Sequence, residues 1–165
     1  MAQDKTLTLR NAATVLIADK GDSVADVGFT TGGIRVTKTY TTSETTADQT
    51  RFPLYTNIDA EKYEINFRML QISTALLKEG WGEAGTALSA ALSLGEYVDT
   101  PASKEIQFYA TRRDGKLVKF TFYDCQLAST GAVEMNRTVD TAIECTYTAL
   151  YDDDQKCCGL MEITS

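Results

Sequence analysis

The sequence predicts a mainly β protein, a β-sandwich or open barrel with one flanking α-helix and a long inter-strand arm, on three observations. Several segments rich in Thr and aromatic residues alternate apolar and polar positions, which is typical of strands with one buried face. One short segment has a helical period instead. A polar stretch much longer than a hairpin loop separates two of the early strands.

The early strands are expected at residues 33–41 and 63–69. Because successive side chains of a strand point to opposite faces, we expect one face of each to be buried and the other solvated. The apolar positions are Ile34, Val36, Tyr40, Tyr63, Ile65, Phe67 and Met69. The polar positions are Arg35, Thr37, Thr39, Thr41, Glu64, Asn66 and Arg68.

The arm is expected between these strands, over residues 41–57. Its first half is polar and β-prone, and its second half carries an apolar cluster formed by Phe52, Pro53, Leu54 and Tyr55. One interpretation is a loop that folds this cluster back onto its own core. We favour an arm that reaches another subunit, because exposed apolar clusters commonly mark interfaces.

The flanking helix is expected over residues 72–79, where Ile72, Ala75 and Leu76 follow a helical rhythm and Gly80 can end the helix. An amphipathic helix needs a partner surface, so we expect it to pack on a sheet face or across an open end. Residues 84–94 fit either a second short helix or an ordered loop, because glycines interrupt the pattern.

A hairpin is expected over residues 106–122. Its apolar residues alternate on both sides of the pair Asp114-Gly115, which tight hairpin turns with positive φ prefer. A further strand is expected at residues 143–148, where Ile143, Cys145 and Tyr147 alternate with polar residues. A short final strand is expected at about residues 160–164.

The composition indicates a single domain over residues 1–165. The chain is 43% hydrophobic and 24% charged, and no Gly/Ser-rich linker divides it. The longest low-charge stretch, residues 85–94, is far short of the roughly 20 apolar residues that cross a bilayer. The N-terminal residues contain no apolar signal segment. We therefore expect a soluble, cytosolic protein without a membrane partner.

The chain contains no histidine, which argues against common hydrolase chemistry. Ser-His-Asp and Cys-His pairs and the HExxH zinc helix all need an imidazole. The four cysteines, Cys125, Cys145, Cys157 and Cys158, lack the CxxC spacing of a thiolate zinc site. We therefore expect no enzyme activity, no catalytic residues, no metal and no cofactor.

An ordered set of segments resembles a known family. It consists of residues 26–36 (Asp-Val-Gly-Phe-Thr-Thr-Gly-Gly-Ile-Arg-Val), the Thr-rich arm with Asp48-Gln49 and Pro53, and a strand leading to Leu76-Leu77. Over roughly residues 24–80 the chain resembles the tail tube (major tail) proteins of long-tailed bacteriophages, whose domain is also similar to the type VI secretion tube. The resemblance implies a β-sandwich flanked by a helix, and hexameric rings stacked into a hollow tube.

The resemblance also implies roles for individual residues. The long loop of this family contacts the neighbouring ring, and the matching segment here is residues 40–56. The implied inter-ring contacts are Tyr40, Glu44, Asp48, Gln49, Arg51, Phe52 and Pro53. The family's glycine positions before the bore-lining strand match Gly28, Gly32 and Gly33. Because glycine permits a tight turn or a positive φ, we interpret these three as structural, and an additional interface role stays open.

The charge of the chain suits a bore that does not retain DNA. Duplex DNA carries one negative charge per roughly 1.7 Å, so a wall of Lys and Arg would bind it, whereas an acidic or Thr-rich wall lets it slide. The net charge of −7 favours repulsion. The lumen candidates are Arg35, Thr37, Thr39, Glu64, Asn66 and Arg68. Arg35 and Arg68 fit a bore only if they pair with acids, and the alternative is that these faces are simply solvated.

The expected function is therefore that of a virion structural protein, located in the tail and assembled in the host cytoplasm, that forms a conduit for genome delivery. Its partners would be other copies of itself, the tape measure, terminator and baseplate or tip proteins, and a sheath if the tail is contractile. DNA would pass without specific binding. A monomeric β-sandwich module that binds carbohydrate or acts like an adhesin is the alternative. An enzyme with paired carboxylates such as Asp22 and Asp26 is disfavoured, because these acids lie in turn-like contexts.

Overall fold

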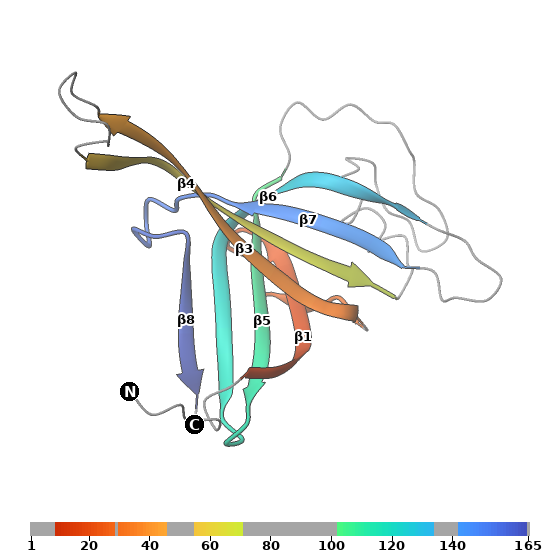
Figure 1. Cartoon of the computed structure of the whole chain (residues 1–165). Helices are drawn as coiled ribbons and strands as arrows, with labels where there is room; N and C mark the ends of the chain where they lie inside the picture. Colours follow the sequence, from red (N-terminus) through yellow and green to blue (C-terminus); the bar gives the residue numbers. More distant parts are fainter. Residues whose placement is uncertain (1–8, 29, 46–54, 71–101, 134–141, 165) are drawn as a thin grey trace.

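The computed structural model describes residues 9–28, 30–45, 55–70, 102–133 and 142–164, which form eight strands (Figure 1). The strands are β1 (Leu9–Asp19), β2 (Ala25–Asp26), β3 (Thr30–Thr45), β4 (Tyr55–Met69), β5 (Lys104–Arg112), β6 (Leu117–Val133), β7 (Ile143–Ala149) and β8 (Gly159–Thr164). All strand pairs between them are antiparallel. The prediction of a mainly β protein is confirmed.

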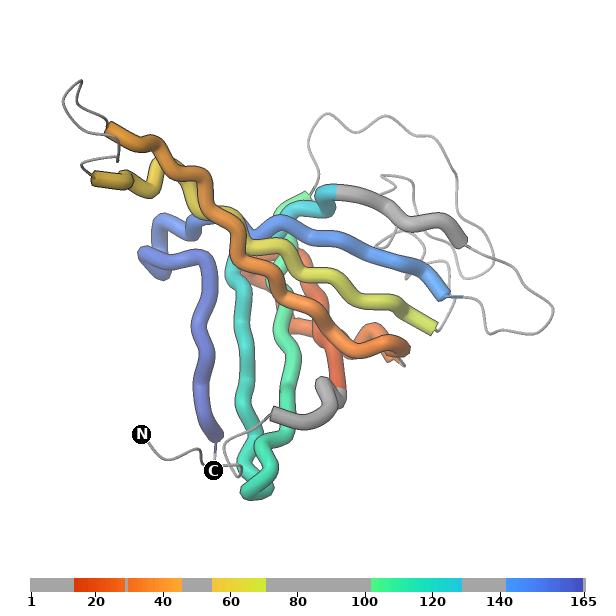
Figure 2. The backbone as a smooth tube through the Cα atoms, in the orientation of Figure 1, coloured from red at the N-terminus to blue at the C-terminus, as the bar shows by residue number. Residues whose placement is uncertain are grey.

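One continuous sheet folds over into two layers. The strand order is β2-β1-β5-β6-β7-β4-β3, and β8 pairs with β6 outside this path. The 17-residue strand β6 belongs to both layers, because residues 117–125 pair with β5 and residues 125–133 pair with β7. Figures 1 and 2 show β8, the first half of β6, β5 and β1 side by side, with β7, β4 and β3 running across them. Register shifts in the second half of β6 allow this strand to bend from one layer into the other.

The apolar core lies between the two layers. Its fully buried side chains are Val15, Ile65, Met69, Ile106, Cys125, Ile143, Cys145 and Tyr147. Phe67 and Tyr147 stack in parallel with their ring centroids 6.0 Å apart, and they come from the neighbouring strands β4 and β7. Such aromatic pairs add to the stabilisation that burial alone supplies.

The predicted hairpin is confirmed as β5 and β6. Ile106 pairs with Phe122 and Ala110 pairs with Val118, so the apolar residues of the two strands share one face as expected. The turn is closed by a 2.8 Å hydrogen bond from the Arg112 N–H to the Lys116 carbonyl. Gly115 has a φ of 87°, which only glycine adopts without strain.

The predicted strands at 63–69, 143–148 and 160–164 are confirmed as β4, β7 and β8. In β7 and in residues 64–69 of β4 the burial alternates residue by residue, as the sequence pattern predicts. In β3 the pattern holds only in part, since Ile34 packs against the core while Tyr40 on the same face is 61% exposed. The reason is that β3 continues past the body of the molecule.

The prediction of a sheet flanked by an α-helix is wrong for the part of the chain that the structure describes, which contains strands and turns and no helix. Residues 72–79 and 84–94, on which helices were expected, lie outside the described residues. The physical reason is that each layer covers the apolar face of the other, so this core needs no helix to cover it. Within the described ranges, no helix has the length and hydropathy needed to span a membrane.

The inter-strand arm is largely a two-stranded ribbon. The expected loop at 41–57 is paired at both ends, with Thr45 opposite Tyr55 and Thr42 opposite Ile58. We define the arm as residues 38–45 of β3 and 55–62 of β4, all of which are exposed. Figure 1 shows this ribbon projecting beyond the sandwich at the upper left.

Candidate assembly surface

A polar face covers the outer side of the layer formed by β3, β4 and β7. Side chains of paired residues in antiparallel strands point to the same side of a sheet. Arg35 pairs with Asn66, which pairs with Thr146 on β7, and Thr37 pairs with Glu64. We define the polar face as Arg35, Thr37, Thr39, Glu64, Asn66, Arg68, Glu144, Thr146 and Thr148. The structure therefore brings all six lumen candidates together on one face.

Charges on the polar face are mixed and mostly paired. The Arg68 guanidinium lies 3.4 Å from the Glu144 carboxylate, and the Glu64 carboxylate lies 2.6 Å from the ammonium of the neighbouring Lys62. The Thr146 hydroxyl donates a 2.5 Å hydrogen bond to the Asn66 side-chain oxygen. Arg35 is exposed and forms no ion pair with any other described residue. Thus Arg68 has the acidic partner that a bore would require, whereas Arg35 has none among the described residues.

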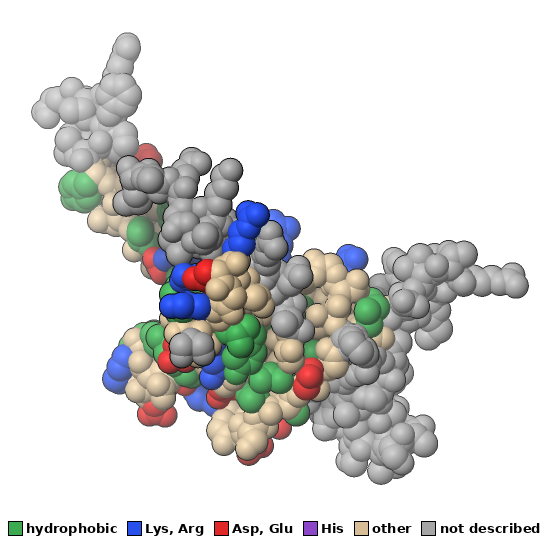
Figure 3. Space-filling view, turned by 90° about the horizontal axis from the view of Figure 1, so that it is seen from below, with side chains coloured by type: hydrophobic (Ala, Val, Ile, Leu, Met, Phe, Trp, Pro, Cys, Tyr) green, Lys and Arg blue, Asp and Glu red, His purple; other side chains and the backbone are tan. Residues whose placement is uncertain are grey.

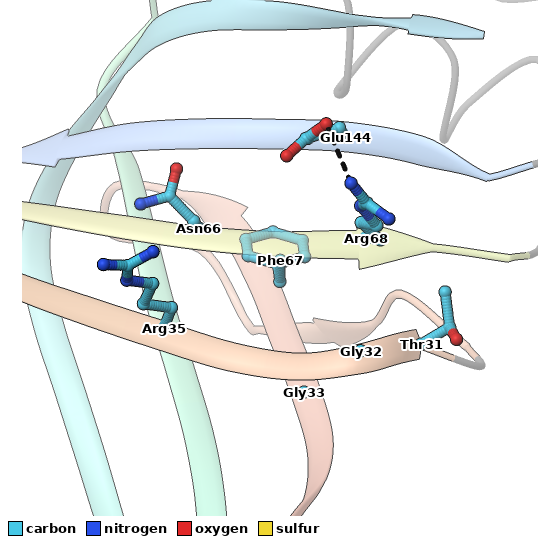
Figure 4. Close-up of a pocket in the computed structure, with 8 residues that line it drawn as sticks. All are labelled: Thr31, Gly32, Gly33, Arg35, Asn66, Phe67, Arg68 and Glu144. Carbon is cyan, nitrogen blue, oxygen red and sulfur yellow. Dashed lines mark hydrogen bonds and ion pairs between the residues drawn. The ribbon is translucent and has the colours of Figure 1, made fainter. Parts of the chain in front are cut away.

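A groove of about 310 Å³ opens at one end of the polar face (Figure 4). The pairing of β3 with β4 is interrupted there: Thr31 pairs with Arg68 and Arg35 pairs with Asn66, so three residues of β3 lie opposite Phe67 alone. Figure 4 shows Phe67 between Arg35 on one side and Arg68 on the other. We call this feature the arginine groove; its lining residues are Thr31, Gly32, Gly33, Arg35, Asn66, Phe67, Arg68 and Glu144.

The glycines singled out by the sequence shape this end of β3. Gly32 and Gly33 form the bulge with φ values of 75° and 76°, and Gly28 has a φ of 80°. The Gly28 N–H also donates a 2.7 Å hydrogen bond to the Asp26 carboxylate, as in an Asx turn. A side chain at any of these positions would be strained, so the glycines permit the turn into β3 and the bulge that opens the arginine groove.

The arm exposes apolar and charged side chains beyond the sandwich. Tyr40 and Ile58 are 61% and 60% exposed, although both lie on the continuation of the face that packs in the core. At the base of the arm, the Lys38 ammonium lies 3.0 Å from the Glu61 carboxylate and 5.3 Å from the centre of the Tyr63 ring. Glu61 and Tyr63 raise the pKa of Lys38, with the hydrogen bond to Glu61 as the largest cause. The space-filling view in Figure 3 shows hydrophobic side chains at the surface of the arm.

Of the seven predicted inter-ring contacts, Tyr40 and Glu44 lie on the arm as exposed residues of β3. Asp48, Gln49, Arg51, Phe52 and Pro53 lie outside the described residues. The sequence placed the whole stretch in a loop, because its Thr-rich composition fits a strand and a polar loop equally well.

β8 adds a second exposed element at a sheet edge. Among the described strands it pairs with β6 alone, and Leu160, Met161 and Ile163 are about half exposed or more. Gly159 fixes where β8 begins, since a Cβ there would lie 2.7 Å from the Thr121 carbonyl oxygen and 2.8 Å from the Phe122 ring. An edge strand with exposed apolar side chains offers both backbone groups and apolar surface to a neighbouring chain.

A three-residue ion cluster holds the turn that leads into β8. The Lys20 ammonium lies 2.9 Å from the Asp124 carboxylate and 2.8 Å from the Asp152 carboxylate, whose side chain is only 3% exposed. These hydrogen bonds raise the pKa of Lys20, the bond to Asp152 more than the bond to Asp124. The hydrogen bond from Lys20 is also the largest cause that lowers the pKa of Asp152, followed by the bond from the Gln155 backbone N–H. The cluster joins β1, β6 and the end of β7.

All four cysteines are free thiols. Cys125 and Cys145 lie in the core, and burial raises the pKa of the Cys125 thiol, so this residue acts as a small apolar side chain. Cys157 and Cys158 are half-buried, and burial is also the largest cause that raises the pKa of Cys158. In the described ranges, His, Cys, Asp and Glu side chains form no group of three or more that could hold a metal ion.

Comparisons with known proteins show a shared fold. No protein-family model matches the chain, and no curated protein matches it. Among solved structures, it is similar to a chain of the sheath–tube complex of an extracellular contractile injection system, PVC, in the extended state. The two chains share 12% identity with a TM-score of 0.51, and the match covers 91% of this chain and 88% of the other. At this identity the likeness concerns the fold alone.

Sequence reasoning missed two features of this surface. In the Lys20 cluster, Lys20 lies 104 positions before Asp124 and 132 positions before Asp152. Nothing in the local sequence marks Lys20 as the partner of these two aspartates. The arginine groove depends on a bulge whose glycines were recognised, but the sequence does not show that three residues of β3 lie opposite one of β4. The sequence signal for this bulge is the pair Gly32-Gly33, two positions before Arg35.

Proposed function

We propose that this chain is a structural tail protein that self-assembles into the hollow tube of a tail-like particle. Three observations support the proposal: the residues that resemble tail tube proteins, the fold shared with a chain of a contractile sheath–tube complex, and the projecting arm. The arm is the strongest of the three, because within a single chain its exposed apolar side chains pack against no second layer.

The arm needs a partner surface. An isolated two-stranded hairpin is marginally stable in water, and residues 38–45 and 55–62 are exposed throughout. Tyr40 and Ile58 continue the core face of the sheet but have no second layer over them. In the proposed tube this surface packs against a subunit of the neighbouring ring, together with Glu44 and the contacts predicted between Asp48 and Pro53.

The polar face suits the wall of a bore in the proposed hexameric ring. Four of its nine residues are threonines, and its arginine and glutamate charges balance at two against two. Lys62, which lies opposite Thr39 on the same side of the sheet, is paired with Glu64. Such a wall offers few unpaired cations to phosphate groups, so DNA or another cargo would pass with little retention. β3 and β8 each have one edge without a strand partner among the described residues, and neighbouring subunits could continue the sheet there.

The proposal extends to the particle. The subunits would stack as hexameric rings, be assembled in the host cytoplasm and reside in the tail of the mature particle. Tape measure, terminator, and baseplate or tip proteins would meet the tube at its ends or inside it, and a sheath would surround it in a contractile tail. The conduit would deliver the genome in a phage. No catalytic step is required of any residue.

Self-assembly of the purified chain tests the proposal. Light scattering across a concentration series and negative-stain microscopy should show rings or hollow filaments of uniform width. Ile58→Ser, which removes an exposed apolar side chain from the arm, should raise the concentration needed for assembly. Leu117→Ser is the matched control, because Leu117 is also an exposed aliphatic residue but lies at the hairpin turn of β6. A chain that stays monomeric at every concentration would contradict the proposal and favour a monomeric binding module.

A further inference from the structure

The two ends of the polar face carry different chemistry. β7 runs antiparallel to β4, with Ala149 beside Tyr63 at the base of the arm and Ile143 beside Met69 at the other end. The arginine groove lies at the end of Ile143 and Met69. The turn that follows β7 starts at the end of Ala149, which is the end from which the arm projects.

The arginine groove is suited to an anionic group. Arg35 has no ion pair with another described residue, and Arg68 shares one, at 3.4 Å, with Glu144. Arg35 and Arg68 both line the groove, where the glycine bulge leaves open space in place of side chains. With Glu144 included, the groove presents two positive charges and one negative charge.

The turn after β7 has an excess of negative charge and is held in shape by hydrogen bonds. Asp152 holds the turn together, because its Oδ1 accepts hydrogen bonds from the N–H groups of Asp154 at 2.9 Å and Gln155 at 2.8 Å. The Asp152 N–H donates a 3.1 Å hydrogen bond to the Cys157 carbonyl, and the Lys20 ammonium binds Oδ2. Asp153, Asp154 and Lys156 are exposed, so beyond the buried Asp152 the turn offers two negative charges and one positive charge. We call residues 152–157 the acidic turn.

The acidic turn and the arginine groove of one molecule cannot meet. They lie at opposite ends of β7, whose residues 143–149 span about 20 Å at the usual rise of about 3.3 Å per residue. Figure 1 shows the β7–β8 connection on the side of the arm and the ends of β4 and β3 that line the groove on the other side. Neither Asp153 nor Asp154 forms an ion pair with another described residue. Complementary groups at opposite ends of one chain favour a head-to-tail contact between copies.

We propose that the arginine groove binds the acidic turn of a second copy of this chain, with Arg35 and Arg68 facing Asp153 and Asp154. The inference rests on the proposed function, and it assigns the contact to stacking: the end with the arm and the acidic turn meets the groove end of the next ring. The Lys20 cluster holds the turn in shape before binding, so little ordering is needed when the contact forms.

Charge reversal in the full-length chain tests the contact. Arg35→Glu should weaken stacking about tenfold, measured as the concentration at half-assembly in sedimentation velocity, and Asp153→Arg/Asp154→Arg should do the same. A chain that carries Arg35→Glu together with Asp154→Arg should recover most of the loss, because the charges are exchanged across the contact. Arg113→Glu is the matched control, since Arg113 is an exposed arginine at the β5–β6 turn. Circular dichroism of each variant verifies the fold.

The outcomes separate this inference from the proposed function. If the wild-type chain forms no assemblies, both fail. If it assembles and Arg35→Glu assembles equally well, or the combined reversal does not recover stacking, the groove contact is wrong and the tube proposal stands. If Arg35→Glu leaves assembly unchanged but abolishes retention of duplex DNA, the groove binds phosphate groups and the proposed contact is again wrong.

Discussion

Gly159→Ala is expected to destabilise β8 because the new methyl group has no room. Its Cβ would lie 2.7 Å from the Thr121 carbonyl oxygen and 2.8 Å from the Phe122 ring, whereas comfortable contacts lie at about 3.5 Å or more. β8 would have to move away by about 0.8 Å, and the carbonyl cannot yield because Thr121 lies in a strand paired on both sides. Overpacking of this kind costs about 1–3 kcal/mol.

A loss of about 2 kcal/mol lowers the unfolding temperature of a chain of this length by about 4–8 °C. Thermal unfolding followed by circular dichroism measures the change, and amide hydrogen exchange should show the largest loss of protection in β8 and in residues 117–122. Leu160→Ala is the control, because Leu160 is 46% exposed and its replacement adds no atoms; the change should stay within about 0.5 kcal/mol. Unchanged protection of β8 in Gly159→Ala would refute the steric argument.

Three further predictions concern the cluster, the core and the groove. Lys20→Met should detach the turn after β7, and amide exchange there should accelerate. In the wild type the lowered pKa of Asp152 contributes stability that is full above the usual value near 3.8 and is lost as the pH falls below it. The stability deficit of Lys20→Met relative to the wild type should therefore be largest near pH 7 and should shrink toward pH 2. Equal stability of the two proteins at pH 7 would contradict the role of the cluster. Ile65→Ala, at a fully buried position, should cost about 2–5 kcal/mol in urea unfolding, and a loss below about 1 kcal/mol would mean that the two layers do not pack on this residue. Gly33→Ala should cost about 1–2 kcal/mol from its positive φ alone, since the space around it is open, and an unchanged midpoint would show that the bulge relaxes.

The strands that lie against the core were predictable because apolar and polar residues alternate along each of them. Ile65 and Phe67 alternate with polar residues, and Asp114-Gly115 marks a turn that local geometry demands. Tyr40 fits the same pattern but is exposed, because nothing local shows where β3 leaves the sandwich. The pattern predicts which face a side chain is on, and not whether a second layer covers it.

The candidate assembly surface was predictable in part for the same reason. The lumen candidates were predicted as two polar sets, one on each strand, because side chains two positions apart in a strand lie on the same face. That the two sets share one face of the sheet follows only from the register of β3 against β4, which the sequence does not show. In the sequence the acidic turn is visible only as three consecutive aspartates, Asp152 to Asp154. Its role as a rigid element depends on Lys20, which is more than one hundred residues away and has no sequence signature for this contact. The flanking helix was inferred from the helical rhythm of residues 72–79, which lie outside the described residues, and within the described ranges each layer of strands covers the apolar face of the other.

The shared strand β6 has a mechanical consequence. Since one unbroken backbone of 17 residues runs through both layers, a pull on the ribbon at one end of the molecule is carried by peptide bonds and ladder hydrogen bonds into the opposite sheet. The two layers cannot separate unless β6 loses its pairing with β5 or with β7. A molecule built in this way should resist separation of its two layers under tension.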